Sequence, residues 1–144
     1  MKLNRFTLDL NLTFKTASIP LMNEVSRPLP ASLPGINIEF GLKQCIGNVA
    51  LLQSLLQRFW QDYREIPVSI AKTALDNQES RQLLHSFKGA AINLGMSELG
   101  DLTQQIIEDT QTTEPLLDEH LQQFREELQR VGTSIESFER LLAD

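Results

Sequence analysis

Apolar residues recur at every third or fourth position through most of the chain from residue 37 onward, which is the spacing of one buried helix face. The most regular stripe predicts a long helix near the C-terminal end, with steps of 4-3-4-3-4-3-4 between its apolar residues, which are Leu117, Leu121, Phe124, Leu128, Val131, Ile135, Phe138 and Leu142. A second long helix is predicted from the cap Asn48 to Ile70, with a kink or a break at Pro67.

Start and stop signals divide the rest of this region into further helices. The predicted start signals are Asn37, Asp76 with Glu79, Ser97, and Thr113 with Glu114 and Pro115, and the stop signals are Gly47 and Gly95. Because every connection in residues 37–144 is short, neighbouring helices should pack antiparallel. Residues 36–144 are therefore predicted to be all-α, an antiparallel up-and-down four-helix bundle with a short additional N-terminal helix.

Residues 1–35 differ from the rest of the chain and are predicted to be an N-terminal extension. Apolar and polar residues alternate from Phe6 to Phe14, which is the period of a half-buried strand, but the chain offers no second strand as a partner. Pairing with another chain, membership of a neighbouring domain and a disordered tail are the open interpretations. Four of the six prolines lie in this extension, so residues 18–35 are predicted to be an extended linker outside the core.

Composition and charge exclude several classes of function. The 144 residues are 41% apolar and 22% charged, as in a soluble globular domain. The net charge is -6, and because residues 1–36 carry +2, the remaining 108 residues carry -8, which argues against nucleic-acid binding. Cys45 is the only cysteine, so no intrachain disulfide is expected and we interpret it as a packing residue. No apolar run is long enough to insert into a membrane.

Only two histidines, His85 and His120, are candidates for chemistry near neutral pH. His120 lies beside the apolar stripe of the last helix and is interpreted as a partly buried structural residue. No metal site is expected, because bundle metal sites use repeated Glu-x-x-His motifs that are absent. His85 lies about 100° around its helix from the inward-facing Leu84. The residues predicted to share its polar face are Arg81, Gln82, Lys88, Gly89, Ile92 and Met96.

Three residues of this face have the properties of a phosphoryl acceptor site. A neutral imidazole is a nucleophile, so His85 is a candidate acceptor. Lys88 would place a cation near an anionic group on His85. Gly89 costs the helix about 1 kcal/mol relative to alanine, and its bare backbone would let another surface approach the imidazole closely. The simpler alternative is a surface histidine beside a surface lysine, with a glycine tolerated by chance.

The sequence HSFKGAAINLG at residues 85–95, followed by Leu99, resembles the signature of histidine phosphotransfer (HPt) domains, the helical carriers of multi-step phosphorelays. That signature is a His, an apolar residue, Lys-Gly, small residues, Leu-Gly and a further Leu. Upstream, LPGINIEFGL at residues 33–42 is similar to the lead-in of HPt domains at the C-terminal ends of bacterial hybrid sensor kinases. The resemblance covers residues 33 to about 110, and the last helix matches in pattern only.

The resemblance implies a role for each residue of the predicted site. His85 would accept a phosphoryl group from the aspartyl phosphate of a receiver domain and pass it to a second receiver. Lys88 would stabilise the phosphoryl group, Gly89 would give the receiver clearance, and contacts with the receiver would come from Arg81, Gln82, Ile92 and Met96. Many relatives carry Glu or Gln about 22 residues after the histidine to bond the imidazole. That position here is Ile107, so the remaining candidates are Gln104 and Glu108.

The resemblance also implies cofactors, partners and location. Mg²⁺ would belong to the receiver, and the chain has no P-loop or other ATP-binding motif, so we expect no cofactor and a phosphotransfer intermediate rather than an enzyme. We expect a cytoplasmic, monomeric carrier, either free-standing or a fragment of a membrane-tethered hybrid sensor kinase, and the linker favours the fragment. The alternative is a non-phosphorylated helical module that docks or sequesters a receiver, which the intact His85, Lys88 and Gly89 argue against.

Overall fold

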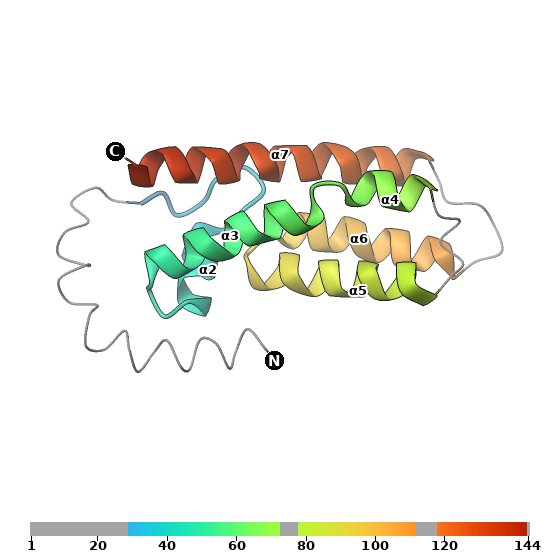
Figure 1. Cartoon of the computed structure of the whole chain (residues 1–144), viewed down its shortest axis with the longest axis horizontal. Coiled ribbons are helices and arrows are strands. Elements are labelled where there is room, and N and C mark those ends of the chain that lie inside the picture. Colours follow the sequence, from blue (N-terminus) through green and yellow to red (C-terminus); the bar gives the residue numbers. More distant parts are fainter. Residues whose placement is uncertain (1–28, 73–77, 112–117, 144) are drawn as a thin grey trace.

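The computed structural model describes residues 29–72, 78–111 and 118–143, and all regular secondary structure in these ranges is helical. One isolated backbone bridge joins Leu33 to Ile36. The prediction of an all-α fold is confirmed. The helices are α2 (Ile38–Gln44), α3 (Val49–Tyr63), α4 (Ile66–Lys72), α5 (Gln78–Asn93), α6 (Ser97–Thr110) and α7 (Asp118–Ala143) (Figure 1).

The long helices lie side by side along a common axis, with α4 continuing the direction of α3 (Figure 1). Each runs opposite to the one before it, and contacts join α5 to α6, α6 to α7, and α3 to both α5 and α7. These contacts close a ring of four neighbours around one core. The short helix α2 packs against α3 near the turn between α5 and α6. The antiparallel four-helix bundle with a short additional helix at its start is therefore confirmed.

The second predicted helix is divided into α3 and α4 at the place that Pro67 indicates. α3 ends at Tyr63 and α4 begins at Ile66, which puts Pro67 in the first turn of α4. A backbone N–H in the first turn has no partner within its own helix, so a proline is tolerated there, whereas in a helix interior it removes a hydrogen bond. Ile66 is buried, so the chain restarts its helix without leaving the core.

Two of the predicted helix caps are confirmed and one is wrong. The side-chain oxygens of Asn37 and Asn48 each accept a hydrogen bond from the backbone N–H three residues later, at 2.9 and 3.0 Å. Ser97, in contrast, is the first residue of α6, and Met96 occupies the cap position without a side-chain hydrogen bond. The left-handed turn at Gly95 is tight enough for α6 to begin one residue earlier than the capping signal predicts.

The apolar stripe predicted for the last helix faces the core. Six of its eight residues, those from Leu121 to Phe138, are at most 9% exposed, and Leu142 is half-buried against them. The eighth, Leu117, lies outside the described residues, as do the predicted start signals at 76 and 113–115. The regular spacing of this stripe therefore predicted which face of α7 is buried.

Aromatic rings join three of the helices at the centre of the bundle. Phe87 of α5 lies between Phe59 of α3 and Phe124 of α7, with 5.4 Å between ring centroids in each pair. All three side chains are buried, and burying one such side chain contributes about 1.5–3 kcal/mol. These rings hold one face of α5 against the core, so the opposite face must point outward.

Residues 29–35 pack against the bundle instead of forming the extended linker that the prolines predict. Leu29 and Leu33 are half-buried against the core, and the Ser134 hydroxyl of α7 donates a hydrogen bond to the Pro34 carbonyl oxygen at 2.5 Å. The linker prediction is wrong for this stretch, because its leucines cover apolar surface that the helices leave open. Residues 18–28 and the strand-like residues 6–14 lie outside the described residues.

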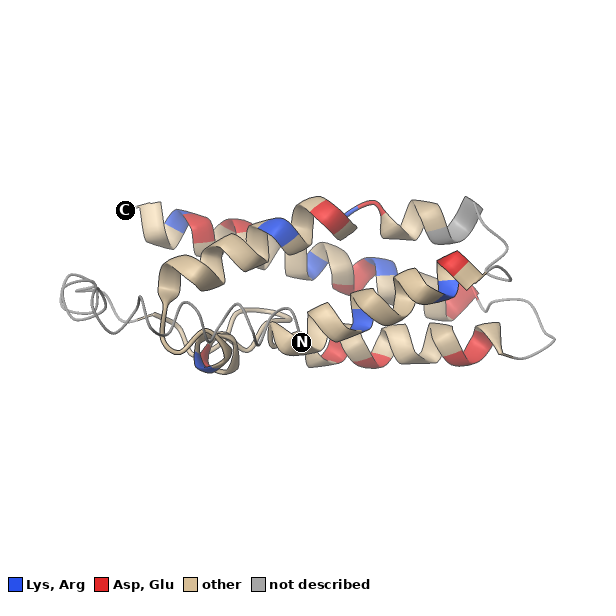
Figure 2. Cartoon of the chain, turned by 60° about the horizontal axis from the view of Figure 1, so that its bottom comes forward, with Lys and Arg blue, Asp and Glu red and all other residues tan. Residues whose placement is uncertain are grey.

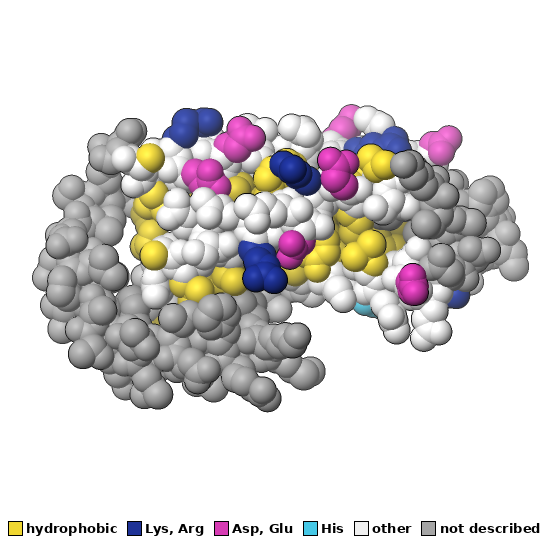
Figure 3. All heavy atoms as spheres, in the orientation of Figure 1, with side chains coloured by type: hydrophobic (Ala, Val, Ile, Leu, Met, Phe, Trp, Pro, Cys, Tyr) yellow, Lys and Arg dark blue, Asp and Glu magenta, His cyan; other side chains and the backbone are white. Residues whose placement is uncertain are grey.

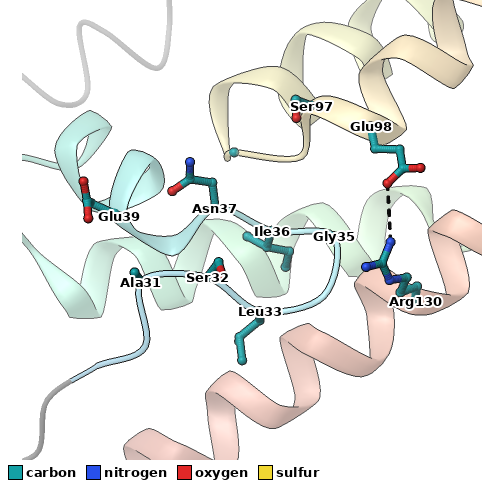
Figure 4. Close-up of a pocket in the computed structure, with 11 residues that line it drawn as sticks. Ala31, Ser32, Leu33, Gly35, Ile36, Asn37, Glu39, Ser97, Glu98 and Arg130 are labelled. Carbon is teal, nitrogen blue, oxygen red and sulfur yellow. Dashed lines mark hydrogen bonds and ion pairs between the residues drawn. The ribbon is translucent and has the colours of Figure 1, made fainter.

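The segment of residues 29–35 also passes over the buried carboxylate of Glu127. Glu127 of α7 is 6% exposed, it accepts a hydrogen bond from Arg130 at 3.1 Å, and burial raises its pKa. Gly35 passes so close that an added Cβ would lie 2.8 Å from the Glu127 Oε2 atom. Arg130 also pairs with Glu98 of α6 at 3.4 Å, in the wall of a surface pocket of about 370 Å³ (Figure 4). The segment is thus packed on α7, and it lines this pocket together with residues of α6.

Any side chain in place of Gly95 at the α5–α6 turn should destabilise the fold, because the φ of Gly95 is +86° and a Cβ there would overlap the Asn37 carbonyl oxygen. We expect Gly95→Ala to lower the free energy of unfolding by about 2 kcal/mol, since a left-handed alanine alone costs about 1–2 kcal/mol. Urea denaturation followed by circular dichroism measures this change.

The matched control is Gly89→Ala in α5, where an added Cβ meets no atom within 4 Å. There, alanine should raise the free energy of unfolding by about 0.5–1 kcal/mol, because it is the better helix former. If the two variants had the same stability, the special role of Gly95 would be refuted.

Candidate functional site

The α5 helix has one buried face and one exposed face, as its sequence predicts. Leu84, Phe87 and Ala91 are fully buried, whereas His85 lies on the exposed side together with Arg81, Gln82, Gly89 and Ile92. Within the described part of the chain, the His85 imidazole has no hydrogen-bond partner. A ring presented in this way is accessible to a second molecule through its nitrogens.

Lys88 lies next to His85 on the side of α5 that faces α6. The two residues are three apart, so their Cβ atoms are about 5–6 Å from one another on a helix. Lys88 is half-buried, and its Nζ atom donates a hydrogen bond of 2.6 Å to the Oε1 atom of Gln104 in α6. The structure therefore tethers the ammonium group of Lys88 to α6, from a residue that lies one helical turn after the exposed imidazole.

Gly89 leaves open space beside His85. An added Cβ at this position would meet no atom within 4 Å, so the packing of the helix does not require a glycine there. Its φ is not among the left-handed values, which the described part of the chain shows for glycine only at 35, 47 and 95. Glycine at this position therefore lowers the stability of the helix without improving the packing of the fold. This agrees with a role in letting a partner approach His85 closely.

One residue predicted for the exposed face is in the core. Met96 is fully buried, because α5 ends at Asn93 and the left-handed Gly95 turns the backbone inward, where the Met96 N–H bonds the Ala91 carbonyl at 2.8 Å. The helical spacing used for the prediction does not extend past the end of the helix. Ile92 is 42% exposed and remains on the face.

Neither predicted partner of the imidazole is hydrogen-bonded to it. The Gln104 amide is bonded to Lys88 and, through its Nε2 atom, to the Glu108 carboxylate at 3.1 Å. Ile107, which occupies the position of the Glu or Gln found in many relatives, is 2% exposed and lies in the core. The expectation that Gln104 or Glu108 orients His85 directly is therefore wrong, and Gln104 instead holds Lys88.

The other candidate side chains have structural roles. His120 is half-buried and its Nδ1 atom lies 2.7 Å from the Asp109 carboxylate, which links α7 to α6. Cys45 is buried, and burial raises the pKa of its thiol to about 11, so it is a packing residue. Trp60 is half-buried and its ring covers Gly132 of α7. The roles of His120 and Cys45 agree with the sequence-based predictions.

Charge is distributed unequally between the two helices of the site. α5 carries the cations Arg81 and Lys88, whereas α6 carries four acidic residues and neither Lys nor Arg (Figure 2). Lys88 thus lies between the exposed imidazole and a helix of negative charge. Nevertheless, its direct hydrogen-bond partner is a neutral amide and not a carboxylate.

A groove between α3 and α5 was not predicted from the sequence. It has a volume of about 220 Å³, and apolar side chains are visible along the line between the two helices (Figure 3). Arg58 and Asp62, an ion pair at 3.5 Å, lie at its α3 side. No local signal marks these residues, because only the packing of α3 on α5 brings them into one groove with Ala90 and Asn93 of α5. The lining residues are Leu55, Arg58, Phe59, Asp62, Tyr63, Ala90, Asn93 and Leu94.

The described geometry is that of a helical bundle that presents an imidazole on an open helix face, where a second protein can reach it. The Hpt domain family model matches residues 50–134, more than half of the chain, and this range contains all of α5 and α6. The chain therefore belongs to the Hpt domain family. Such domains are carriers of histidine phosphotransfer in phosphorelay signalling, without an ATP site of their own, and they interact with receiver domains.

Comparisons with individual proteins give no match that adds to the family assignment. Neither the curated proteins nor the solved structures give a significant match to the chain. None of the helices within the described ranges is both long and apolar enough to cross a membrane. The same ranges contain no group of three or more His, Cys, Asp or Glu residues that could hold a metal ion.

We expect diethyl pyrocarbonate to modify His85 faster than His120 at neutral pH. The reagent attacks an accessible, unprotonated ring nitrogen, and the His120 side chain is 25% exposed with Asp109 at 2.7 Å from its Nδ1 atom. Proteolytic digestion and mass spectrometry after short reaction times measure the two rates. In concentrated urea, where the fold is lost, the rates should become similar. Faster modification of His120 in the folded protein would contradict the described exposure of the two rings.

Proposed function

We propose that this domain is a phosphorelay carrier in which His85 accepts a phosphoryl group from the aspartyl phosphate of one receiver domain and passes it to an aspartate of another. The observation that carries the proposal is the exposed imidazole on α5, three residues before a tethered lysine and inside the range that the family model matches. The open space at Gly89 supports it, since two different partners must reach the same ring.

Each transfer exchanges one bond to phosphorus for another. In the first, a ring nitrogen of His85 attacks the phosphorus atom, the N–P bond forms, and the P–O bond to the receiver carboxyl breaks, with the carboxylate leaving with the bonding electrons. The phosphorylated ring then loses the proton of its other nitrogen to water. In the second transfer, an aspartate oxygen of the next receiver attacks phosphorus, and the N–P bond breaks to restore the imidazole, which regains the proton.

The residues around His85 have complementary roles in this proposal. Lys88 offsets part of the negative charge of the phosphoryl group, which is the principal barrier to moving a phosphoryl group between two proteins. Gly89 allows close approach, and the exposed Arg81, Gln82 and Ile92 contact the receiver. Met96 has no part in docking, because it is buried.

We place the receiver over the exposed face of α5 and the adjoining groove to α3, where apolar side chains and the Arg58–Asp62 pair reach the surface. The Mg²⁺ that assists transfer would be held by the receiver. The phosphoryl source would be a hybrid sensor kinase, acting in cis or in trans, as the likeness of residues 33–42 to the lead-in of such modules suggests. We place this exchange in the cytoplasm, with the domain acting as a monomer.

The proposal predicts that His85 is the residue that becomes phosphorylated. Incubation with a radiolabelled phosphorylated receiver should give label that is lost in acid and kept in base, which distinguishes phosphohistidine from an aspartyl phosphate. His85→Gln should carry no such label, because glutamine has no nucleophilic ring nitrogen. The matched control is His120→Gln, which should be labelled like the wild type. Equal labelling of His85→Gln and the wild type would sink the proposal.

The clearance at Gly89 is tested by filling it. We expect Gly89→Arg to slow transfer from the receiver by about tenfold or more, which corresponds to about 1.4 kcal/mol in the barrier, because the guanidinium would occupy the space beside the imidazole. Circular dichroism should show unchanged helicity, since that space contains no other atom of the chain within 4 Å of a Cβ.

The matched control for this variant is Gln129→Arg, which adds the same side chain to an exposed position of α7. It should transfer at the wild-type rate. Normal transfer by Gly89→Arg would show that clearance at this position is irrelevant to the partner.

A further inference from the structure

The Lys88 ammonium is held by a short chain of hydrogen bonds that leads away from the proposed acceptor along α6. Lys88 Nζ donates to Gln104 Oε1 at 2.6 Å, and Gln104 Nε2 donates to Glu108 Oε2 at 3.1 Å. Both Lys88 and Gln104 are half-buried between the two helices. The contact is therefore partly withdrawn from water, which makes a hydrogen bond to a charged group stronger than it is at an open surface.

The chemistry of its two neighbours fixes the orientation of the Gln104 amide. An ammonium group can only donate hydrogen bonds and an ionised carboxylate can only accept them. The amide oxygen must therefore face Lys88 and the amide nitrogen must face Glu108. Glu108 thus determines that the amide oxygen of Gln104 faces the lysine, although Glu108 is not itself hydrogen-bonded to Lys88.

The neutrality of this contact matters for the charge of the lysine. α6 already carries four carboxylates, and a further carboxylate in the place of Gln104 would form an ion pair with Lys88. An ion-paired lysine has part of its charge neutralised before a phosphoryl group arrives. An amide oxygen, in contrast, holds the ammonium in place and leaves its full charge available.

We infer that Gln104 is a positioning residue that acts through Lys88: it holds the ammonium beside His85 before the phosphoryl group arrives, and Glu108 keeps the amide in the required orientation. This inference rests on the proposed function of His85 and Lys88. Its physical basis is preorganisation, since a long lysine side chain that is already placed does not have to be ordered during the transfer. A role confined to packing α5 on α6 would not depend on Lys88.

The test is a double-mutant cycle in the rate of phosphoryl transfer from a phosphorylated receiver. Gln104→Met keeps the length of the side chain but removes the acceptor, and we expect it to slow transfer by about threefold to tenfold. On a Lys88→Ala background, the same substitution should cause no further loss, because no ammonium remains to be positioned. Gln105→Met, the same change at the neighbouring exposed position of α6, should leave the rate unchanged.

Two outcomes of this cycle would overturn the inference. One is a wild-type rate for Gln104→Met, and the other is an equal slowing by this substitution with and without Lys88, which would indicate a structural effect. Thermal melts of all variants identify any loss of fold. A readout that does not require transfer separates this inference from the proposed function: the ¹⁵N NMR signal of the Lys88 ammonium should be protected from exchange in the wild type and lost in Gln104→Met. An unchanged signal would refute the positioning role, whereas a lost signal with no labelling of His85 would refute only the proposed function.

Discussion

The turn at Gly95 determines how the two helices that form the site lie against each other. Its φ of +86° reverses the chain between α5 and α6, and its carbonyl oxygen accepts a hydrogen bond from the Asn37 N–H at 2.8 Å. Because the reversal is short, the two helices run alongside each other, and Lys88 meets Gln104 across their interface. The same turn buries Met96 and fastens the start of α2 to the end of α5. The site chemistry therefore depends on a backbone conformation that only glycine adopts readily.

The bundle separates stability from chemistry on the two sides of a single helix. The inward face of α5 contributes Leu84, Phe87 and Ala91 to the core, and none of these reaches the surface. The outward face carries His85 and Gly89, which meet little of the rest of the chain. The proposed carrier role needs this arrangement, since a donor and then an acceptor would have to reach the His85 ring. An enzyme that acts on small molecules would instead enclose the reacting groups to exclude water.

Several features were predicted from the sequence because they depend on local rules. The periodicity of apolar residues placed the buried face of α7, Pro67 marked the break between α3 and α4, and Asn37 and Asn48 marked two helix starts. The exposed position of His85 follows from its angle around the helix relative to Leu84. These predictions succeeded because a helix repeats with a fixed period and each signal acts within one turn.

Other features could not be obtained in this way. Met96 was placed on the exposed face by extending the helical period past Asn93, where the helix has already ended. The prolines of residues 29–35 indicated a linker, but Leu29 and Leu33 found apolar surface on the bundle. The sequence by itself determined the helices, their faces and the histidine that one face presents, because these depend on neighbours within one or two turns. Only the tertiary structure decided that Gln104 holds Lys88 and not His85, and that α3 and α5 form a groove. Those contacts join residues on different helices, whose relative placement is set by turns and packing.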